Sequence, residues 1–146
     1  MPSVSGLLPW LEGVWAFQRS IDSGASIVGT AVFIGRDNGR FDYAEHGQLT
    51  LANGDRLDAE RRYIFKKGAE GFTVLFAETP PRLFHCIALV RHGANLVGAA
   101  THLCAHDRYD SRYEFHPDGS FIVKHRVRGP RKRYVITTQY SREAAT

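Results

Sequence analysis

The stretch Gly13-Val14-Trp15-Ala16-Phe17-Gln18-Arg19-Ser20-Ile21 alternates between two kinds of residue along its length. Trp15, Phe17, Arg19 and Ile21 occupy one parity, whereas small and polar residues occupy the other. Because successive side chains of a strand point to opposite faces, this alternation predicts a half-buried β-strand. One member of the buried face, Arg19, is charged.

An inward charge recurs in two later stretches that alternate in the same way. In residues 41–51 the apolar parity also holds Glu45, and in residues 57–65 it also holds Arg61. Burying a charge is costly unless the charge is paired, so these residues predict an interior polar network or a wet cavity. Two cations and one anion leave about one positive charge for a ligand to neutralise.

Short strands separated by turn residues follow one another along the whole chain. We expect strands at residues 13–21, 26–35, 40–51, 56–66, 71–77, 82–91, 96–104, 108–116, 120–128 and 131–141. The connections are short and carry turn signals such as Asp37-Asn38-Gly39, which favours antiparallel neighbours. Closing such a meander into a barrel removes its unpaired edges.

We therefore predict an all-β protein, an antiparallel up-and-down closed β-barrel of about ten strands. A short helical turn is expected at residues 7–12, and residues 1–146 are expected to form a single domain. The facing of two strands stays open. Both parities of residues 82–91 are apolar around His85, and small residues in 96–104 leave His102 free to point either way.

The composition is that of a soluble globular protein, with 43% hydrophobic and 23% charged residues. No apolar run approaches the ~20 residues needed to span a bilayer, and the first six residues lack the features of a secretory signal. Cys86 and Cys104 do not make a disulfide framework. We expect a cytoplasmic protein that does not associate with membranes.

The net charge of +4 comes from one segment. Residues 124–134 hold six of the 19 basic residues, and the other 13 face 15 acidic ones. The pattern is typical of a solvated hairpin, and it does not favour a nucleic-acid partner. An alternative is a protein-interaction module that uses this basic hairpin.

Two positions near the ends of the predicted barrel resemble lipocalins and the wider calycin group. Gly13-Val14-Trp15 opens the first strand, and Arg142 ends the last one. In those barrels a Gly-x-Trp begins the barrel, and an arginine of the final strand packs over the indole at the closed end. The resemblance implies this structural role for Trp15 and Arg142.

Over residues 10–142 the chain also resembles an uncharacterised bacterial family of lipocalin-like proteins of unknown function. The motifs that carry this resemblance are Trp15-x-Phe17-x-Arg19, Ala59-x-Arg61-x-Tyr63, His102-x-Cys104-x-x-Asp107-x-Tyr109 and Val127-x-Gly129-Pro130-Arg131-Lys132-x-Tyr134. The resemblance implies a barrel fold and brings no established activity.

The inward polar and aromatic residues predict binding of a small amphipathic or anionic molecule inside the barrel. Arginine matches anionic groups with its fixed fork of donors, and tyrosine offers an apolar wall with a hydroxyl. The candidate ligand-binding residues are Arg19, Tyr43, Glu45, Arg61, Tyr63, His85, His102, Tyr113 and Tyr134. The alternative is an Arg-Glu-Arg network that satisfies itself and binds nothing.

Other functions remain open at this point. A small enzyme could act on such a ligand with Glu45 or His85 as its acid or base. His102, His106 and Asp107 are metal-ligand types, but their spacing suits a helix better than a strand, and one histidine could bind haem. We expect no catalytic residue, metal or cofactor, and either a monomer or a homodimer.

Overall fold

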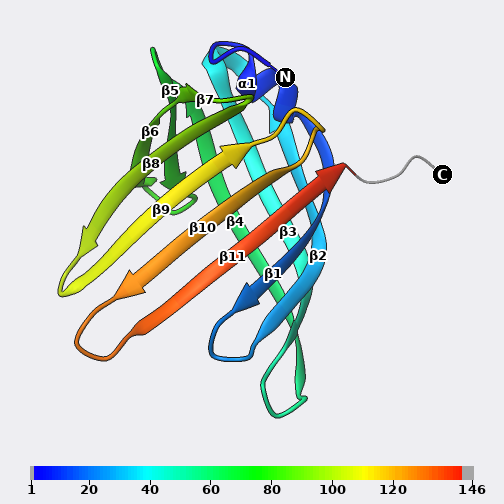
Figure 1. Ribbon diagram of the computed structural model, residues 1–146, viewed down its shortest axis with the longest axis vertical. Coiled ribbons are helices and arrows are strands. Elements are labelled where there is room, and N and C mark those ends of the chain that lie inside the picture. The colour runs from blue at the N-terminus through cyan, green and yellow to red at the C-terminus, as the bar shows by residue number, and fades with distance from the viewer. Residues whose placement is uncertain (1, 143–146) are drawn as a thin grey trace.

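The computed structural model describes residues 2–142, whose strands form one antiparallel sheet that curls into a nearly closed barrel (Figure 1). The elements are α1 (Leu7–Leu11), β1 (Gly13–Ile21), β2 (Ser26–Gly35), the short 3-10 turn η1 (Asp37–Gly39), β3 (Arg40–Thr50), β4 (Arg56–Lys67), β5 (Gly71–Phe76), β6 (Arg82–Ala88), β7 (Val90–His92), β8 (Asn95–Cys104), β9 (Asp107–Phe115), β10 (Phe121–Arg128) and β11 (Arg133–Arg142). The all-β class and the barrel are as predicted.

The sheet follows the chain, with the order β6-β5-β4-β3-β2-β1-β11-β10-β9-β8-β7. The first and last strands pair with each other, Trp15 opposite Arg142 and Arg19 opposite Thr138. This pairing joins the two halves of the meander. The result is the up-and-down barrel expected from the short connections.

The structure contains eleven strands rather than about ten because the strand expected at 82–91 is divided at Leu89. Its first part, β6, pairs with β5, and its second part, β7, pairs with β8. Leu89 is buried, and its backbone N–H donates to the Glu70 carbonyl. One bent segment therefore belongs to both ends of the sheet and carries the chain across the seam of the barrel.

The helix α1 lies at one end of the barrel (Figure 1), with Leu7, Leu8 and Leu11 buried. The Leu11 carbonyl accepts a hydrogen bond of 2.7 Å from Nε1 of Trp15, which is fully buried. This contact fixes the helix over the start of β1. The strands run up and down, so the hairpin turns after β1, β3, β8 and β10 lie at the opposite end.

Arg142, the last residue of β11, closes the same end of the barrel as α1. Its guanidinium lies 3.9 Å from the centroid of the Trp15 ring, donates to the carbonyl of Glu12 at 3.0 Å, and also donates to the carbonyl of Trp10. The expected contact between Arg142 and Trp15 is therefore present. Carbonyl acceptors and an aromatic face together hold the arginine in place.

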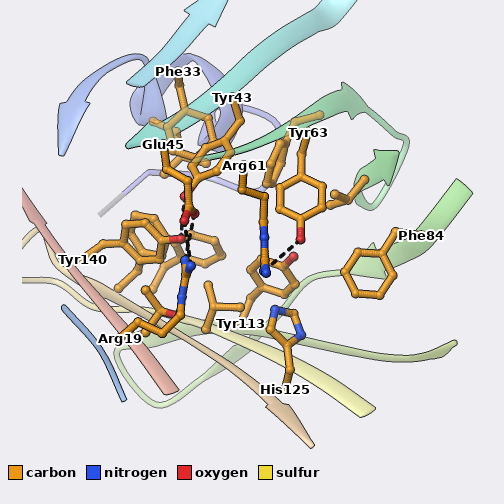
Figure 2. A pocket seen from close by; sticks show the side chains of 17 residues that line it. Arg19, Phe33, Tyr43, Glu45, Arg61, Tyr63, Phe84, Tyr113, His125 and Tyr140 are labelled. Atoms are coloured by element: carbon orange, nitrogen blue, oxygen red, sulfur yellow. Dashed lines mark hydrogen bonds and ion pairs between the residues drawn. The ribbon is translucent and has the colours of Figure 1, made fainter. Parts of the chain in front are cut away.

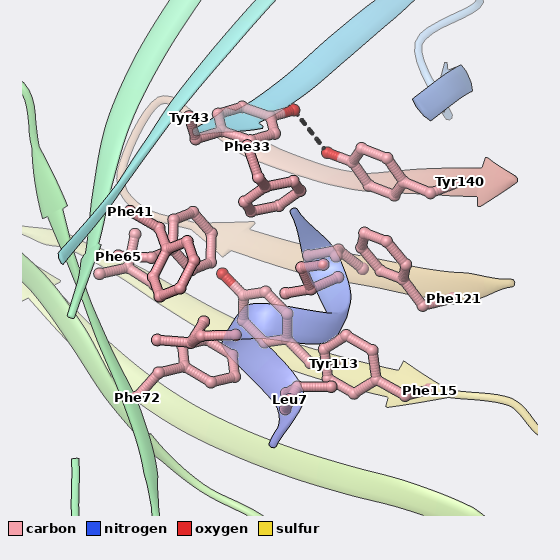
Figure 3. Packing of buried hydrophobic residues seen from close by; sticks show 14 of the residues in the cluster. Leu7, Phe33, Phe41, Tyr43, Phe65, Phe72, Tyr113, Phe115, Phe121 and Tyr140 are labelled. Atoms are coloured by element: carbon pink, nitrogen blue, oxygen red, sulfur yellow. Dashed lines mark hydrogen bonds between the residues drawn. The ribbon is translucent and has the colours of Figure 1, made fainter. Parts of the chain in front are cut away.

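Aromatic side chains fill the interior between this end and the middle of the barrel (Figure 3). Phe121 and Tyr140 stack with ring centroids 4.3 Å apart, and Phe72 meets Tyr113 edge-on at 5.2 Å. Such pairs add to the burial of apolar area. This half of the barrel is packed.

None of the helices in residues 2–142 is long and apolar enough to cross a membrane.

Trp15→Ala should lower the free energy of unfolding by about 3–5 kcal/mol, because it removes a fully buried aromatic side chain and leaves a cavity. Urea unfolding followed by circular dichroism measures the loss. Val28→Ala serves as the control, because Val28 is 62% exposed on a neighbouring strand and should change stability by about 0.5 kcal/mol or less. Similar small losses in both variants would contradict this role for Trp15.

Candidate functional site

Arg19 and Glu45 meet inside the barrel across a row without side chains. Arg19 pairs with Ile27, while Glu45 pairs with Ala31, further along β2 on the same face. Between these rungs lies the pair Gly29 and Gly47. A Cβ on Gly29 would overlap the His46 carbonyl and lie 2.9 Å from the Phe17 ring. The two glycines leave room for the Phe17 ring, and the Arg19 guanidinium lies 4.9 Å over that ring as it reaches Glu45.

The Arg19 guanidinium and the Glu45 carboxylate form a two-pronged ion pair (Figure 2). Nη1 and Nη2 of Arg19 donate to the two carboxylate oxygens at 2.6 and 2.8 Å, and Nε donates to the Thr138 hydroxyl at 2.8 Å. The Tyr43 hydroxyl donates to Glu45 at 2.6 Å and lies 2.8 Å from the Tyr140 hydroxyl. The charges of Arg19 and Glu45 are thus neutralised by each other and hydrogen-bonded by neighbouring side chains.

Burial is the largest single influence on the titration of this pair, but the partners together outweigh it. Burial would raise the pKa of Glu45, whereas the hydrogen bonds from Arg19 and Tyr43 and the positive charges of Arg19 and Arg61 together hold this pKa below its usual value. Burial alone would lower the pKa of Arg19, but the hydrogen bond to Glu45 and nearby negative charge raise it. Both groups are therefore charged, and each depends on the other.

Arg61 borders the same chamber as Arg19 and Glu45 but takes no part in their ion pair. Its side chain extends into the interior (Figure 2), yet the residue is exposed, and within residues 2–142 its one side-chain hydrogen bond runs from Nη1 to the Tyr63 hydroxyl at 3.3 Å. Residues 56–62 of β4 pair with β3 but not with β5, which joins β4 only from Tyr63 onward. The missing neighbour explains the exposure.

The interior holds two neighbouring chambers of very different size. The inner chamber is a small cavity of about 30 Å³ that contains the Arg19–Glu45 pair and is walled mainly by aromatic side chains. The outer chamber, about 330 Å³, lies among the strand ends opposite α1. Four residues line both chambers and form the neck between them: Arg61, Tyr63, Phe84 and His125.

A β-bulge places Phe84 in the neck. Val74 pairs with His85, and the next residue, Leu75, pairs with Leu83, so Phe84 is the extra residue of β6. A bulge interrupts the alternation of side chains, and here both Phe84 and His85 are buried. This irregularity explains why both parities of residues 82–91 are apolar.

Three histidines surround the Phe84 ring at centroid distances of 4.1 Å for His85, 5.7 Å for His125 and 5.5 Å for His102. Nε2 of His85 lies 2.9 Å from the Tyr113 hydroxyl, while its Nδ1 is buried without a hydrogen-bond partner among residues 2–142. His102 lines the outer chamber, and its buried Nε2 likewise has no partner in that part of the chain.

The remaining predicted site residues are divided between the chambers. Tyr43 and Tyr113 line the inner chamber, Tyr134 lines the outer one, and His85 lines neither. Four further residues line the chambers without having been predicted as site residues: Phe76, Phe84, His125 and Tyr140. The inward parity of His125 and Tyr140 was readable from their strands, whereas the position of Phe84 depends on the bulge.

The geometry gives little support to catalysis by Glu45 or His85. Glu45 accepts three hydrogen bonds from Arg19 and Tyr43, so its oxygens are engaged. His85 is buried outside both chambers. Among residues 2–142, no three His, Cys, Asp or Glu side chains are grouped closely enough to hold a metal ion.

The basic hairpin lies on the outer face of the barrel. Lys124, Arg126 and Arg128 are exposed, and Arg128 pairs with Asp110 at 2.9 Å. Lys132 pairs with Asp107 at 3.3 Å. Neighbouring carboxylates thus neutralise part of the hairpin's positive charge, as on a solvated sheet face.

Glu45→Ala should lower the free energy of unfolding by about 3–5 kcal/mol, because it leaves the buried Arg19 charge without a partner. Arg61→Gln should change stability by about 0.5 kcal/mol or less, since Arg61 is exposed. Parallel urea titrations compare the two variants. Equal losses would mean that Arg61 belongs to the same structural network.

The protein should lose stability in mild acid because two histidines are held neutral. Burial, with the neighbouring histidines, lowers the pKa of His85 to about 3, and burial, with nearby arginines, lowers the pKa of His125 to about 4. Below pH ~6.5 these two histidines bind protons in the unfolded chain but stay neutral in the folded chain. Stability should therefore fall as the pH drops below this value, by about 2 kcal/mol per histidine at pH ~5.

Urea midpoints at pH ~5 and ~8 test this dependence, with the ordinary histidine pKa lying between them. The double variant His85→Gln/His125→Gln should show a much smaller difference between the two pH values. His92→Gln, at an exposed position of β7, should keep the full difference. An unchanged difference in the double variant would assign the acid sensitivity to other groups.

Comparison with known proteins shows the fold and the family. A search of curated protein sequences found no match. Among solved structures, a de novo designed fluorescence-activating β-barrel has a TM-score of 0.54 at 12% identity, over 97% of this chain and 100% of the other. EF1p2_mFAP2b bound to DFHBI has a TM-score of 0.50 at 13% identity, over 97% and 100%.

These two structures share the β-barrel fold with this protein, and at such low identity the likeness extends to the fold alone. The sequence itself matches the model of a family of unknown function, DUF6314, over residues 11–142. That match covers nearly the whole barrel, from the end of α1 to the end of β11. The chain belongs to the DUF6314 family of unknown function.

Proposed function

We propose that this protein binds a small amphipathic or anionic molecule in the interior of its barrel. The observation that carries the proposal is the Arg61 guanidinium, which reaches the neck between the chambers. Among residues 2–142 no carboxylate forms an ion pair with it. Since Arg19 and Glu45 neutralise each other, Arg61 supplies the positive charge that remains in the interior.

Two further observations support binding by a barrel of this kind. Aromatic residues form most of the walls around Arg61, which suits the apolar part of an amphipathic molecule. A solved barrel of the same fold has DFHBI bound. The interior of this protein thus combines an apolar wall with a few polar groups, as small-molecule sites commonly do.

The proposal also covers the type of barrel, the cellular compartment and the oligomeric state. The packing of Arg142 on Trp15, after Gly13, supports a lipocalin-like barrel with its closed end at α1. The free and exposed thiols of Cys86 and Cys104 support a reducing compartment such as the cytoplasm. We propose one domain that acts as a monomer or a homodimer, with no catalytic residue assigned.

Binding of the anionic fluorescent probe anilinonaphthalene sulfonate tests the proposal. The wild type should bind it in the barrel, and Arg61→Gln should raise the Kd about tenfold or more, because a hydrogen bond to a charged group contributes about 1.5–3 kcal/mol. Arg91→Gln is the charge-matched control, at an exposed position of β7 outside both chambers. Native mass spectrometry of the freshly purified protein should also reveal a bound small molecule.

Two results would count against binding in the interior. One is equal affinity of the wild type, Arg61→Gln and Arg91→Gln for the probe. The other is probe fluorescence that rises only when the barrel unfolds, which would place the probe on exposed apolar surface.

A further inference from the structure

The two chambers differ in what they offer a ligand. In the inner chamber the polar groups of Arg19, Glu45, Tyr43 and Tyr140 hydrogen-bond to one another. They have little left to give to a polar ligand group, and displacing them would expose a buried charge. The outer chamber is larger and does not depend on this network.

Aromatic rings form the walls of the outer chamber. Phe76 and Phe84 stack with centroids 4.7 Å apart and planes inclined by 24°, and Tyr63 stacks on Phe84 at 6.1 Å and 23°. Tyr109 meets Phe84 edge-on at 6.1 Å, and Tyr134 completes the lining. These rings stack on one another, and together they give the chamber an aromatic lining against which an aromatic ring can pack edge-on or offset, as aromatic pairs prefer.

The charges of the outer chamber have one sign. Its lining includes Arg61, Arg62 and Arg82, and no aspartate or glutamate lines it among residues 2–142. Arg82 is neutralised by Glu78 through hydrogen bonds of 3.1 and 3.2 Å and lies 4.3 Å over the Phe76 ring. Arg61, at the neck, is therefore the arginine best placed to bind an anionic group that enters between the aromatic walls.

A second polar contact is available on the β8 side of the outer chamber. Nε2 of His102 is buried, lacks a hydrogen-bond partner within residues 2–142, and belongs to a side chain that lines this chamber. A buried polar atom without a partner is unfavourable unless something hydrogen-bonds to it. In the observed rotamer Nε2 is closed off from the chamber, and a rotation of the imidazole that turns Nε2 toward it would let a polar substituent on the ring of a ligand supply that bond.

We propose that the ligand is a planar aromatic carboxylate with a second hydrogen-bonding substituent, such as a hydroxyl, on its ring. The carboxylate binds Arg61 at the neck, the ring lies against Phe84, Phe76 and Tyr63, and the substituent meets Nε2 of His102. This proposal rests on the proposed function and narrows it to one class of molecule bound in the outer chamber. It excludes a long aliphatic chain that threads into the inner chamber.

Isothermal titration calorimetry with four probes of similar size tests this class: hydroxynaphthoate, naphthoate, naphthol and decanoate. We expect naphthoate to bind about tenfold more tightly than decanoate, and the best hydroxynaphthoate isomer to bind several-fold more tightly than naphthoate. Arg61→Gln should weaken both naphthoates about tenfold while leaving naphthol nearly unchanged. His102→Leu should remove the preference for the hydroxyl and leave naphthoate binding nearly unchanged.

Arg91→Gln and His92→Gln are the matched controls, because both residues are exposed on β7 and line neither chamber. Decanoate binding that equals naphthoate binding and depends on Arg61 would overturn the aromatic class while the proposed function stands. A preference for hydroxynaphthoate that survives His102→Leu would overturn the role of His102. Failure of all four probes and of anilinonaphthalene sulfonate to bind would remove the proposed function as well.

Discussion

The ion pair between Arg19 and Glu45 is the constraint on which the interior depends. A charge in an apolar barrel is tolerated only when a partner and further hydrogen bonds replace the water it loses, and here Thr138 and Tyr43 provide the further bonds. Between the two charges, Gly29 and Gly47 make room for the Phe17 ring, over which the Arg19 guanidinium lies. Small residues on β2 and β3 thus help to place the side chains that surround the buried pair.

Satisfying that pair has a consequence for ligand chemistry. An arginine that already donates to a carboxylate and a hydroxyl cannot bind an anion without giving up bonds it has made. The remaining interior cation, Arg61, is nearer the mouth, where β4 extends beyond β5 and admits solvent. The chemistry available to a ligand therefore moves from the middle of the barrel to its neck and outer chamber.

Alternation of side chains was sufficient to predict the inward direction of Arg19, Glu45 and Arg61, and together with the short turn-bearing connections it predicted the barrel. Parity tells which face a side chain occupies, but it does not tell which strands lie across the barrel or how far a sheet edge extends. For this reason the sequence could not show that Arg19 forms its ion pair with Glu45. Nor could it show that Arg61 is exposed because β5 pairs with β4 only from Tyr63 onward. His125 was recognisable as inward, but its neighbour Phe84 comes from a distant strand.

The bulge at Phe84 affects both the face that side chains occupy and the way strands meet across the barrel. It is invisible to a period-two pattern because it consists of a change in that period, and its only trace in the sequence is a strand that is apolar on both parities. By turning both Phe84 and His85 inward, it places one ring in the neck and shields one imidazole from both chambers. A single extra residue in β6 thus helps to separate the outer chamber from the Arg19–Glu45 pair. Outer-chamber residues that do not border the inner chamber, such as Phe76, His102 and Tyr109, can consequently vary with the ligand without contacting the buried charges.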